Sequence, residues 1–162
     1  MTKTKYLFSL TVLLIVSSVT FAGVPGTIQS AMKKIYPKVS NPDWSLKNNY
    51  FVADFTADGM NKNAWFDTNG NWIMTQTDLE TMDEVPGAVY NTFAFSQYAS
   101  WPVNDVILAE FPKCPSVIVV KVGEFNMDVY YYLFYSLQGN LLNTYNSDYF
   151  DGTLGPEVFD CP

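Results

Sequence analysis

The chain has 162 residues, a formal net charge of −7 at pH 7, and neither histidine nor arginine. Nucleic acid is bound through cationic contacts to phosphates, so this composition argues against nucleic acid and against anionic membranes as partners. It also excludes a histidine general base, a histidine metal ligand and a serine-histidine-aspartate triad.

Residues 1–22 have the order of a secretory signal peptide: two lysines, an apolar run over residues 6–16, and small residues that end at Ala22. The apolar run is shorter than the roughly 20 residues that span a bilayer. A transmembrane anchor is therefore the weaker alternative. Cleavage near Ala22 predicts a secreted or periplasmic single domain, residues 23–162, without a stable membrane anchor.

The first half of this domain shows the pattern of one helix followed by four strands. Apolar residues recur at helical spacing in VPGTIQSAMKKIYP, residues 24–37, and Pro37 ends the run. Turn residues such as Asn48-Asn49 separate the apolar stretches that follow. These stretches predict strands around Trp44 and over residues 50–56, 63–67 and 71–77.

The second half repeats this order from Val85, where Val-Pro-Gly recurs 61 residues after Val24. A helical pattern over residues 85–101 precedes strands expected over residues 103–111, 117–122 and 128–135 and after Gly139. The sequence thus predicts an α+β domain with two tandem α-β-β-β-β repeats, about 24–80 and 85–150, and an irregular C-terminal tail.

The stretch AWFDTNGNWIMT, residues 64–75, has two interpretations. Asp67, Asn69 and Asn71 alternate as the first three ligands of a calcium loop do. An EF-hand loop requires glycine at its sixth position, and the sixth residue counted from Asp67 is Trp72.

The second interpretation is a hairpin. Asn69-Gly70 between two apolar runs is typical of a two-residue type I′ turn, in which both central residues have positive φ. The second repeat keeps the glycine, as Gly139, but has Ser136 in place of Asp67. We therefore favour the hairpin and expect no metal site.

The two cysteines of the chain are Cys114 and Cys161. In an oxidising compartment, such a pair is more often a disulfide than a metal site or a nucleophile. A Cys114–Cys161 disulfide would tie the tail to the loop before the strand expected over residues 117–122.

Several features together resemble the secreted PepSY-like, β-lactamase-inhibitor-like family. They are Val24-Pro25 at the helix start, Tyr36-Pro37 at its end, Trp44 in the first strand, and the hairpin WFDTNGNW, residues 65–72. The resemblance implies helices packed on one face of an antiparallel sheet. By analogy of fold it also implies inhibitor-type binding.

Pairing across the predicted two-residue turns assigns the faces of the sheet. Phe66 would pair with Ile73 and, in the second repeat, Tyr135 with Leu142, on a face that we assign to the helices with Ile28, Ile35, Val89 and Phe93. The other face should stay open, and an uncovered aromatic patch marks interaction sites. The expected binding residues on it are Trp65, Trp72, Met74, Tyr130, Tyr132 and Phe134.

The favoured function is therefore a non-enzymatic secreted or periplasmic protein that binds a protein or peptide through this face, with no cofactor. Two alternatives stay open: a small-ligand or carbohydrate binder that uses its tryptophans, and a carboxylate-dependent enzyme. The acidic residues between the repeats are expected to form a solvated connector: Asp78, Glu80, Asp83 and Glu84.

Overall fold

Two helices and eight strands dominate the residues that the structure, a computed structural model, describes: 23–123, 129–159 and 161. The predicted signal peptide lies outside these residues. In chain order the elements are α1 (Gly26–Ile35), β1 (Asp43–Lys47), β2 (Tyr50–Ala57), β3 (Met60–Phe66), β4 (Trp72–Asp78), the 3-10 turn η1 (Met82–Glu84), α2 (Gly87–Ala94), β5 (Val103–Glu110), β6 (Val117–Gly123), β7 (Tyr130–Ser136), β8 (Leu141–Asn146) and the 3-10 turn η2 (Pro156–Val158).

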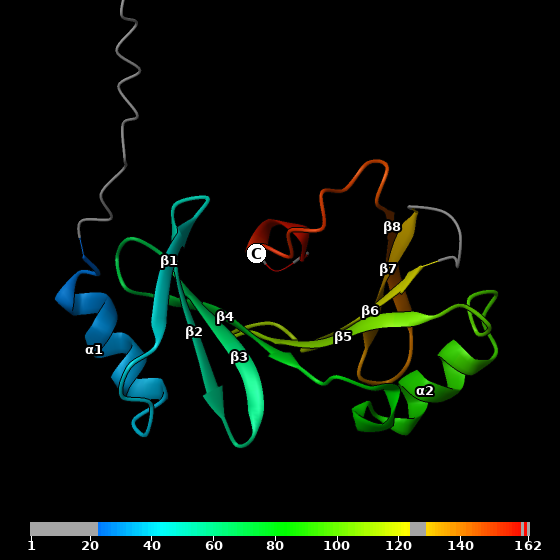
Figure 1. Ribbon diagram of the computed structural model, residues 1–162, viewed down its shortest axis with the longest axis horizontal. Helices are drawn as coiled ribbons and strands as arrows, with labels where there is room; N and C mark the ends of the chain where they lie inside the picture. Colours follow the sequence, from blue (N-terminus) through cyan, green and yellow to red (C-terminus); the bar gives the residue numbers. More distant parts are fainter. Residues whose placement is uncertain (1–22, 124–128, 160, 162) are drawn as a thin grey trace, which may run out of the picture.

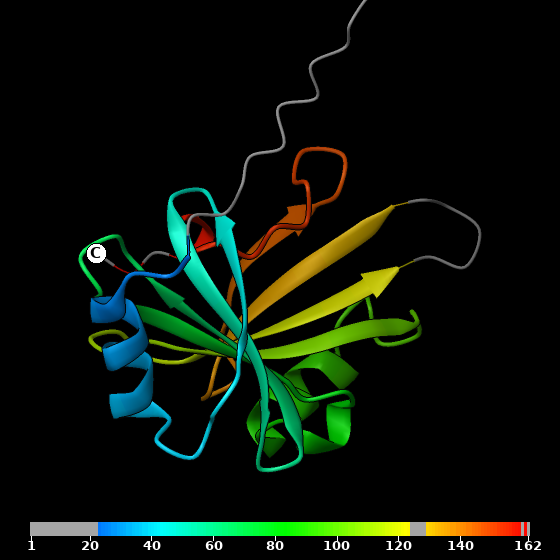
Figure 2. The same cartoon turned by 60° about the vertical axis from the view of Figure 1, so that its left-hand side comes forward.

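The eight strands form one antiparallel sheet in the order β1 to β8, so that each strand pairs with its neighbours in the sequence. Pairing of β4 with β5 makes the sheet continuous across both halves of the chain. Figure 1 shows α1 and α2 on the same side of the curved sheet, and Figure 2 shows its strong twist. The predicted α+β class, with helices on one face of an antiparallel sheet, is confirmed.

Helix α1 follows Pro25 and packs on the sheet through one stripe. Ile28 and Met32, one turn apart, are buried against Ala53, Ala64 and Phe66 of β2 and β3. The two alanines leave room for the helix to approach the sheet closely. Burial of each large apolar side chain contributes roughly 1.5–3 kcal/mol, so this stripe, rather than helix propensity, fixes α1 in place.

Helix α2 follows Pro86 and uses the matching positions, Val89 and Phe93. Both side chains are buried in a larger core cluster beneath the second half of the sheet. The strand residues of that cluster are Val106, Ile118, Val120, Val122, Leu133 and Tyr135. The assignment of Val89, Phe93 and Tyr135 to the helix-covered face is therefore confirmed.

The β3–β4 hairpin closes with a different turn from the one predicted. The backbone N–H of Gly70 donates to the carbonyl of Asp67 (3.0 Å), and the N–H of Asp67 donates to the carbonyl of Asn71 (3.0 Å). Gly70 has φ +87°, whereas Asn69 is not among the residues with positive φ. The loop is thus a three-residue loop with glycine in the left-handed conformation and a bulge, and the prediction of a type I′ turn was wrong.

The extra loop residue changes which side chains face each other beside the turn. Phe66 pairs with Trp72, not Ile73, and the bulge then restores the expected pairing of Trp65 with Met74. The β7–β8 hairpin has the same arrangement, because Tyr135 pairs with Leu141 rather than with the predicted Leu142. Trp72 therefore lies on the helix-covered face, and that part of the face assignment was wrong.

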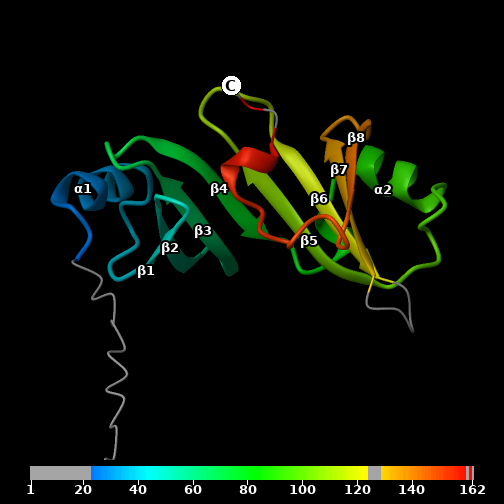
Figure 3. The same ribbon diagram turned by 90° about the horizontal axis from the view of Figure 1, so that it is seen from above.

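The C-terminal tail, residues 147–159, runs from β8 back over the face of the sheet opposite the helices, as Figures 1 and 3 show. We call this face the tail-side face. The disulfide between Cys114 and Cys161, with Cα atoms 5.8 Å apart, joins the chain just beyond the tail to the β5–β6 loop. The predicted disulfide is confirmed.

Candidate functional site: the tail-side face of the sheet

The expected open aromatic surface is largely covered. Trp65, Met74, Tyr132 and Phe134 do lie on the tail-side face, but their exposed fractions are only 3%, 0%, 7% and 3%. The apolar side chains of the tail pack over them, which the pattern of the strands alone could not reveal. The prediction that these residues are exposed was wrong, and their part in partner binding stays a prediction.

The other two expected binding residues are half-buried and far apart in the fold. Trp72 belongs to the cluster beneath α1, and its Nε1–H donates to Oγ1 of Thr75 (3.0 Å). Tyr130 stands on β7, where Nζ of Lys121 lies 4.5 Å from its ring centroid, a cation–π contact. The six residues therefore do not form one surface.

Beside the two turns, two residues that we assigned to the helix-covered face are not covered by a helix. Leu142, assigned to the helix-covered face, is 56% exposed, and Ile73 packs against the cluster of the tail-side face. A carbohydrate binder that stacks sugars on tryptophan would need an exposed ring face. Trp65 is buried and Trp72 half-buried, so the structure does not favour that alternative.

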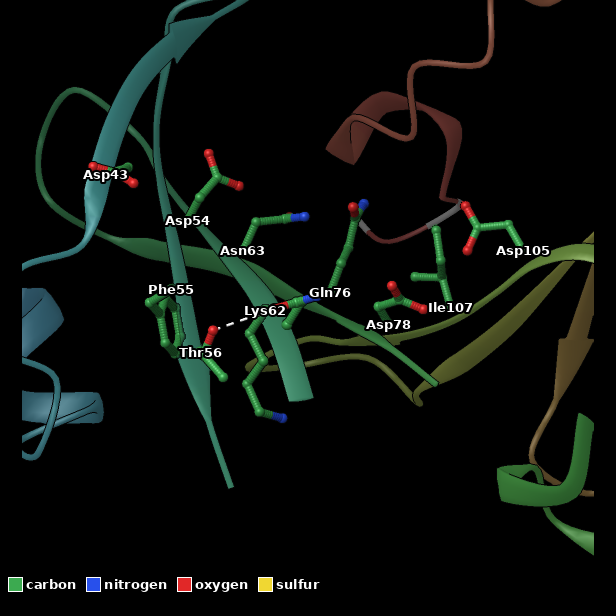
Figure 4. A pocket seen from close by; sticks show the side chains of 11 residues that line it. Asp43, Asp54, Phe55, Thr56, Lys62, Asn63, Gln76, Asp78, Asp105 and Ile107 are labelled. Carbon is green, nitrogen blue, oxygen red and sulfur yellow. Dashed lines mark hydrogen bonds between the residues drawn. The ribbon is translucent and has the colours of Figure 1, made fainter. Parts of the chain in front are cut away.

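The part of the tail-side face that the tail leaves open holds a polar cleft of about 440 Å³. Four aspartates line it, each from a different strand: Asp43 of β1, Asp54 of β2, Asp78 of β4 and Asp105 of β5. Figure 4 shows these side chains gathered around the cleft.

The register of the sheet explains why the cleft is polar. Asp43 lies opposite Asp54, Asp54 opposite Asn63, and Asn63 opposite Gln76, so four polar side chains form one row across β1 to β4. Gln76 is buried, and its Nε2 donates to the backbone carbonyl of Leu154 in the tail. Gln76 is thus the boundary between the open cleft and the covered half of the face.

Two of the aspartates have a raised pKa. Partial burial raises the pKa of Asp105, the nearby Asp78 carboxylate raises it further, and the Val106 backbone N–H and the Lys121 ammonium oppose the change. A proton bound to Asp105 removes a partly buried negative charge and also relieves its repulsion with Asp78. The cleft is therefore a site where a positive charge from outside would be stabilised.

Asp54 shows the same behaviour at the other side of the cleft. Its partial burial raises its pKa, Lys47 lowers it, and Asp43 raises it. The net effect is upward despite the neighbouring lysine.

Sequence reasoning missed this cleft. Asp78 was expected in a solvated connector, yet it stands at the end of β4 and faces the cleft, while Asp83 and Glu84 are exposed on η1. Strand alternation places Asp54 on the same face as Val52. Whether the four aspartates line one cleft depends on the order of the strands in the sheet, which alternation does not give. The available signal was limited to Asp54 and Asp105, which lie within β2 and β5, whereas Asp43 and Asp78 are the first and last residues of their strands.

In the β3–β4 hairpin, the carboxylate of Asp67 stabilises the turn. One carboxylate oxygen of Asp67 accepts hydrogen bonds from the backbone N–H groups of Asn69 (2.9 Å) and Asn71 (2.8 Å), and the other from the Asn71 amide (2.8 Å). Desolvation acts to raise the pKa of Asp67, but these hydrogen bonds outweigh it and lower the pKa. The carboxylate is therefore occupied by its own loop.

Two further findings concern the described residues only. Within them, no group of three or more histidine, cysteine, aspartate or glutamate side chains is arranged to hold a metal ion. In that same part of the chain, neither helix is long and apolar enough to cross a membrane.

Comparison with known proteins gives a family. The family model described as "Putative beta-lactamase-inhibitor-like, PepSY-like" matches residues 49–143. That range contains Asp54, Asp78 and Asp105 of the cleft. No curated protein shows significant similarity to the chain.

Solved structures from Bacteroides species share the fold. A DUF2874 family protein from Bacteroides ovatus is 44% identical, with a TM-score of 0.80, and the match covers 85% of this chain and 97% of that one. A Bacteroides eggerthii protein, described among "putative periplasmic proteins", is 36% identical over 85% and 99% of the two chains, with a TM-score of 0.79. A BLIP-like protein from Bacteroides fragilis is 38% identical over 85% and 97%, with a TM-score of 0.76.

Proposed function

Because the chain belongs to the PepSY-like, β-lactamase-inhibitor-like family, we propose that it is a secreted or periplasmic, non-enzymatic protein that binds a protein partner through the open cleft of the tail-side face. The periplasmic location rests on the description of the Bacteroides eggerthii relative and on the signal-peptide pattern. The non-enzymatic role rests on the family and on the absence of histidine from the sequence.

The observation that carries this proposal is the cleft with its four aspartates. Asp54 and Asp105, whose pKa is raised by partial burial and by a neighbouring carboxylate, lower their electrostatic energy when a lysine or arginine side chain of a partner enters. The net charge of −7, which the loss of the two N-terminal lysines would make −9, also steers cationic surfaces towards the protein. The partner segment is therefore rich in lysine or arginine.

An inhibitor-like role fits this geometry by analogy of fold. The relative from Bacteroides fragilis is described as BLIP-like, and the cleft here is lined mainly by side chains of paired strands, which give a binding partner a preformed surface. Under this proposal the partner is a secreted or periplasmic protein with a basic segment.

A charge-neutralising double variant tests the proposal. The protein is immobilised, exposed to periplasmic extract of its source organism, and compared with Asp54→Asn/Asp105→Asn. We expect a reproducible partner whose capture falls about tenfold or more in the variant and also falls with added salt.

The matched control is Asp83→Asn/Glu84→Gln, which removes the same two charges from the exposed turn η1. Capture should be unchanged in this control. Equal loss in both variants would show that only net charge matters, and equal capture by all three proteins would place the binding surface elsewhere.

A further inference from the structure

The C-terminal tail covers half of the tail-side face in the way that a bound peptide covers a groove. Its floor is apolar, spans β2 to β7 and is almost fully buried. The floor residues are Val52, Trp65, Met74, Ala109, Val119, Tyr132 and Phe134. Uncovered, these side chains would form an apolar patch of the kind that marks protein interaction sites.

We infer that this floor is a second binding groove, for an extended apolar peptide, which the chain's own tail occupies and the Cys114–Cys161 disulfide holds shut. The inference does not rest on the acidic cleft or on its partner. Its ligand is apolar and extended, whereas the cleft takes a cationic segment.

The tail contacts the floor as a bound peptide does, through separate side-chain anchors. The Phe150 ring meets the Tyr132 ring edge-on at 4.9 Å, and the Phe159 ring packs edge-on against Phe134 at 5.5 Å. Leu154, between them in the sequence, is buried against the same floor. The ligand class is therefore a segment with apolar side chains four to five residues apart.

The backbone of the tail adds few bonds to the sheet. Residues 147–159 contribute no strand to the eight-stranded sheet. Their polar links to it include the Gln76–Leu154 bond and a 3.3 Å bond from the Asn48 amide to Glu157. Ser147 extends the β7–β8 pairing, because its N–H donates to the Tyr130 carbonyl (2.9 Å) and its Oγ accepts the Tyr130 N–H (2.9 Å). The other backbone bonds of the tail are local, such as the one from the Phe159 N–H to the Pro156 carbonyl. Lifting the tail beyond Ser147 would therefore break no β-ladder.

The chain can lift the tail from the edge of the sheet. It leaves β8, which pairs only with β7, through a turn at Ser147 and Asp148 and the 93% exposed Tyr149. The other end is fixed by the disulfide, and Cys161 borders two surface clefts. Both cysteines are half-buried residues that line one of these clefts, from which a reductant would approach the disulfide.

Opening the groove requires a dithiol reductant, a protein or a small molecule. The Cys114–Cys161 bond breaks and both sulfurs become thiols by taking up two electrons and two protons, while the dithiol is oxidised to a disulfide. The tail is then tethered only at β8. An external peptide can compete for the floor.

A peptide added in trans tests the inference. The probe is a fluorescent peptide of residues 148–159, DYFDGTLGPEVF, and binding to the full chain is followed by anisotropy before and after reduction. We expect binding to the reduced protein to be at least about tenfold tighter. After reduction the tail is attached at one end only, so it competes with the peptide at a lower effective concentration. The control peptide, with Leu154→Ser and Phe159→Ser, should bind neither form.

Amide exchange provides the second measurement. On reduction, residues 150–159 should exchange about tenfold faster or more, while β3 and β6 keep their protection. The Cys114→Ser/Cys161→Ser variant should match the reduced protein. The inference is overturned if tail protection is unchanged, if the peptide binds oxidised and reduced protein equally or binds neither, or if reduction unfolds the whole sheet.

Discussion

Two turn glycines occupy corresponding places in the two halves but have different surroundings. Gly70 and Gly139 both have positive φ, +87° and +83°. A Cβ on Gly70 would lie 3.6 Å from the backbone of Thr27, an ordinary contact. A Cβ on Gly139 would lie 2.5 Å from the carbonyl oxygen of Ala88 in α2, which is a clash.

Alanine substitutions should therefore differ in cost. Gly70→Ala should lower the free energy of unfolding by about 1–2 kcal/mol, the cost of the left-handed conformation. Gly139→Ala should cost about 1–3 kcal/mol more, because the first turn of α2 must shift. Urea denaturation of both variants measures the difference in the free energy of unfolding. Equal losses of free energy in the two variants would mean that the first turn of α2 shifts without cost.

Asp67 supports a second prediction. Asp67→Ala should lower the free energy of unfolding by about 1 kcal/mol, because the N–H groups of Asn69 and Asn71 lose their acceptor. Asp67→Ser should lose less, since Oγ of Ser136 accepts the N–H of Asn140 (3.2 Å) in the matching turn. A serine that costs as much as alanine would contradict the role we give this carboxylate.

The pH dependence of Asp67 has a definite sign. Its pKa in the folded protein is lowered below the ordinary 3.8, so its stabilising effect is complete above that value and is lost as pH falls through the folded-state pKa. The gap between wild type and Asp67→Ala should therefore close in strong acid. Calcium should leave the melting temperature of the wild type unchanged; a rise that Asp67→Ala abolishes would restore the calcium-loop interpretation.

At the residue scale, the sequence predicted the turn glycines but not the turn type. An Asn-Gly pair fits a two-residue turn. An aspartate two residues before the pair's asparagine can instead accept N–H groups of the loop and favour a type I turn. Asp67 has that place, and its three hydrogen bonds decide between the two conformations.

Among the elements, strand alternation was reliable wherever no bulge intervened. On β7 it correctly separated Tyr135, under α2, from Tyr132 and Phe134 on the tail-side face. The errors are confined to the residues beside the two bulges: Trp72 and Ile73 on β4, and Leu142 on β8. One extra loop residue moves a side chain to the other face, and the bulge restores the register one pair later.

The cleft is formed by several elements together, and its electrostatics can be tested at Asp105. The pKa of Asp105 in the folded protein is raised above the ordinary 3.8. As pH rises from 3.8 through this higher folded-state pKa, ionisation of Asp105 makes the folded state less stable. Asp105→Asn should therefore raise the melting temperature at neutral pH. Below the ordinary pKa the two proteins should melt alike.

The control for this measurement is Asp83→Asn on the exposed turn η1, because it also removes one negative charge but at a position that does not line the cleft. It should change the melting temperature less. A less stable Asp105→Asn at neutral pH would contradict the repulsion between Asp78 and Asp105 on which the cleft's affinity for cations depends.

For the whole molecule, the sequence predicted the architecture but not which surface stays open. The helices and strands follow from local periodicity, and each half of the sheet has its own core. The course of the tail depends instead on four apolar residues in a stretch rich in glycine, proline and acidic residues: Phe150, Leu154, Val158 and Phe159. No local pattern indicates that they cross the sheet, so the aromatic face was expected to be bare.

The disulfide links the tail to the stability of the whole molecule. Cys114 and Cys161 are 47 residues apart, and the chain-entropy model gives about 4 kcal/mol for a closed loop of that length. This figure assumes that the native state is unchanged when the bond is removed. If the tail leaves the sheet in the reduced protein, the native state gains freedom as well, and the loss must be smaller.

We therefore expect Cys114→Ser/Cys161→Ser to lower the free energy of unfolding by clearly less than about 4 kcal/mol. The urea m-value should distinguish the two cases. With a docked tail, it should rise, because the unfolded chain is no longer cross-linked; with a released tail, the native state already exposes part of the floor, which offsets the rise. A full loss of about 4 kcal/mol together with a higher m-value would mean that the tail stays on the sheet without its disulfide.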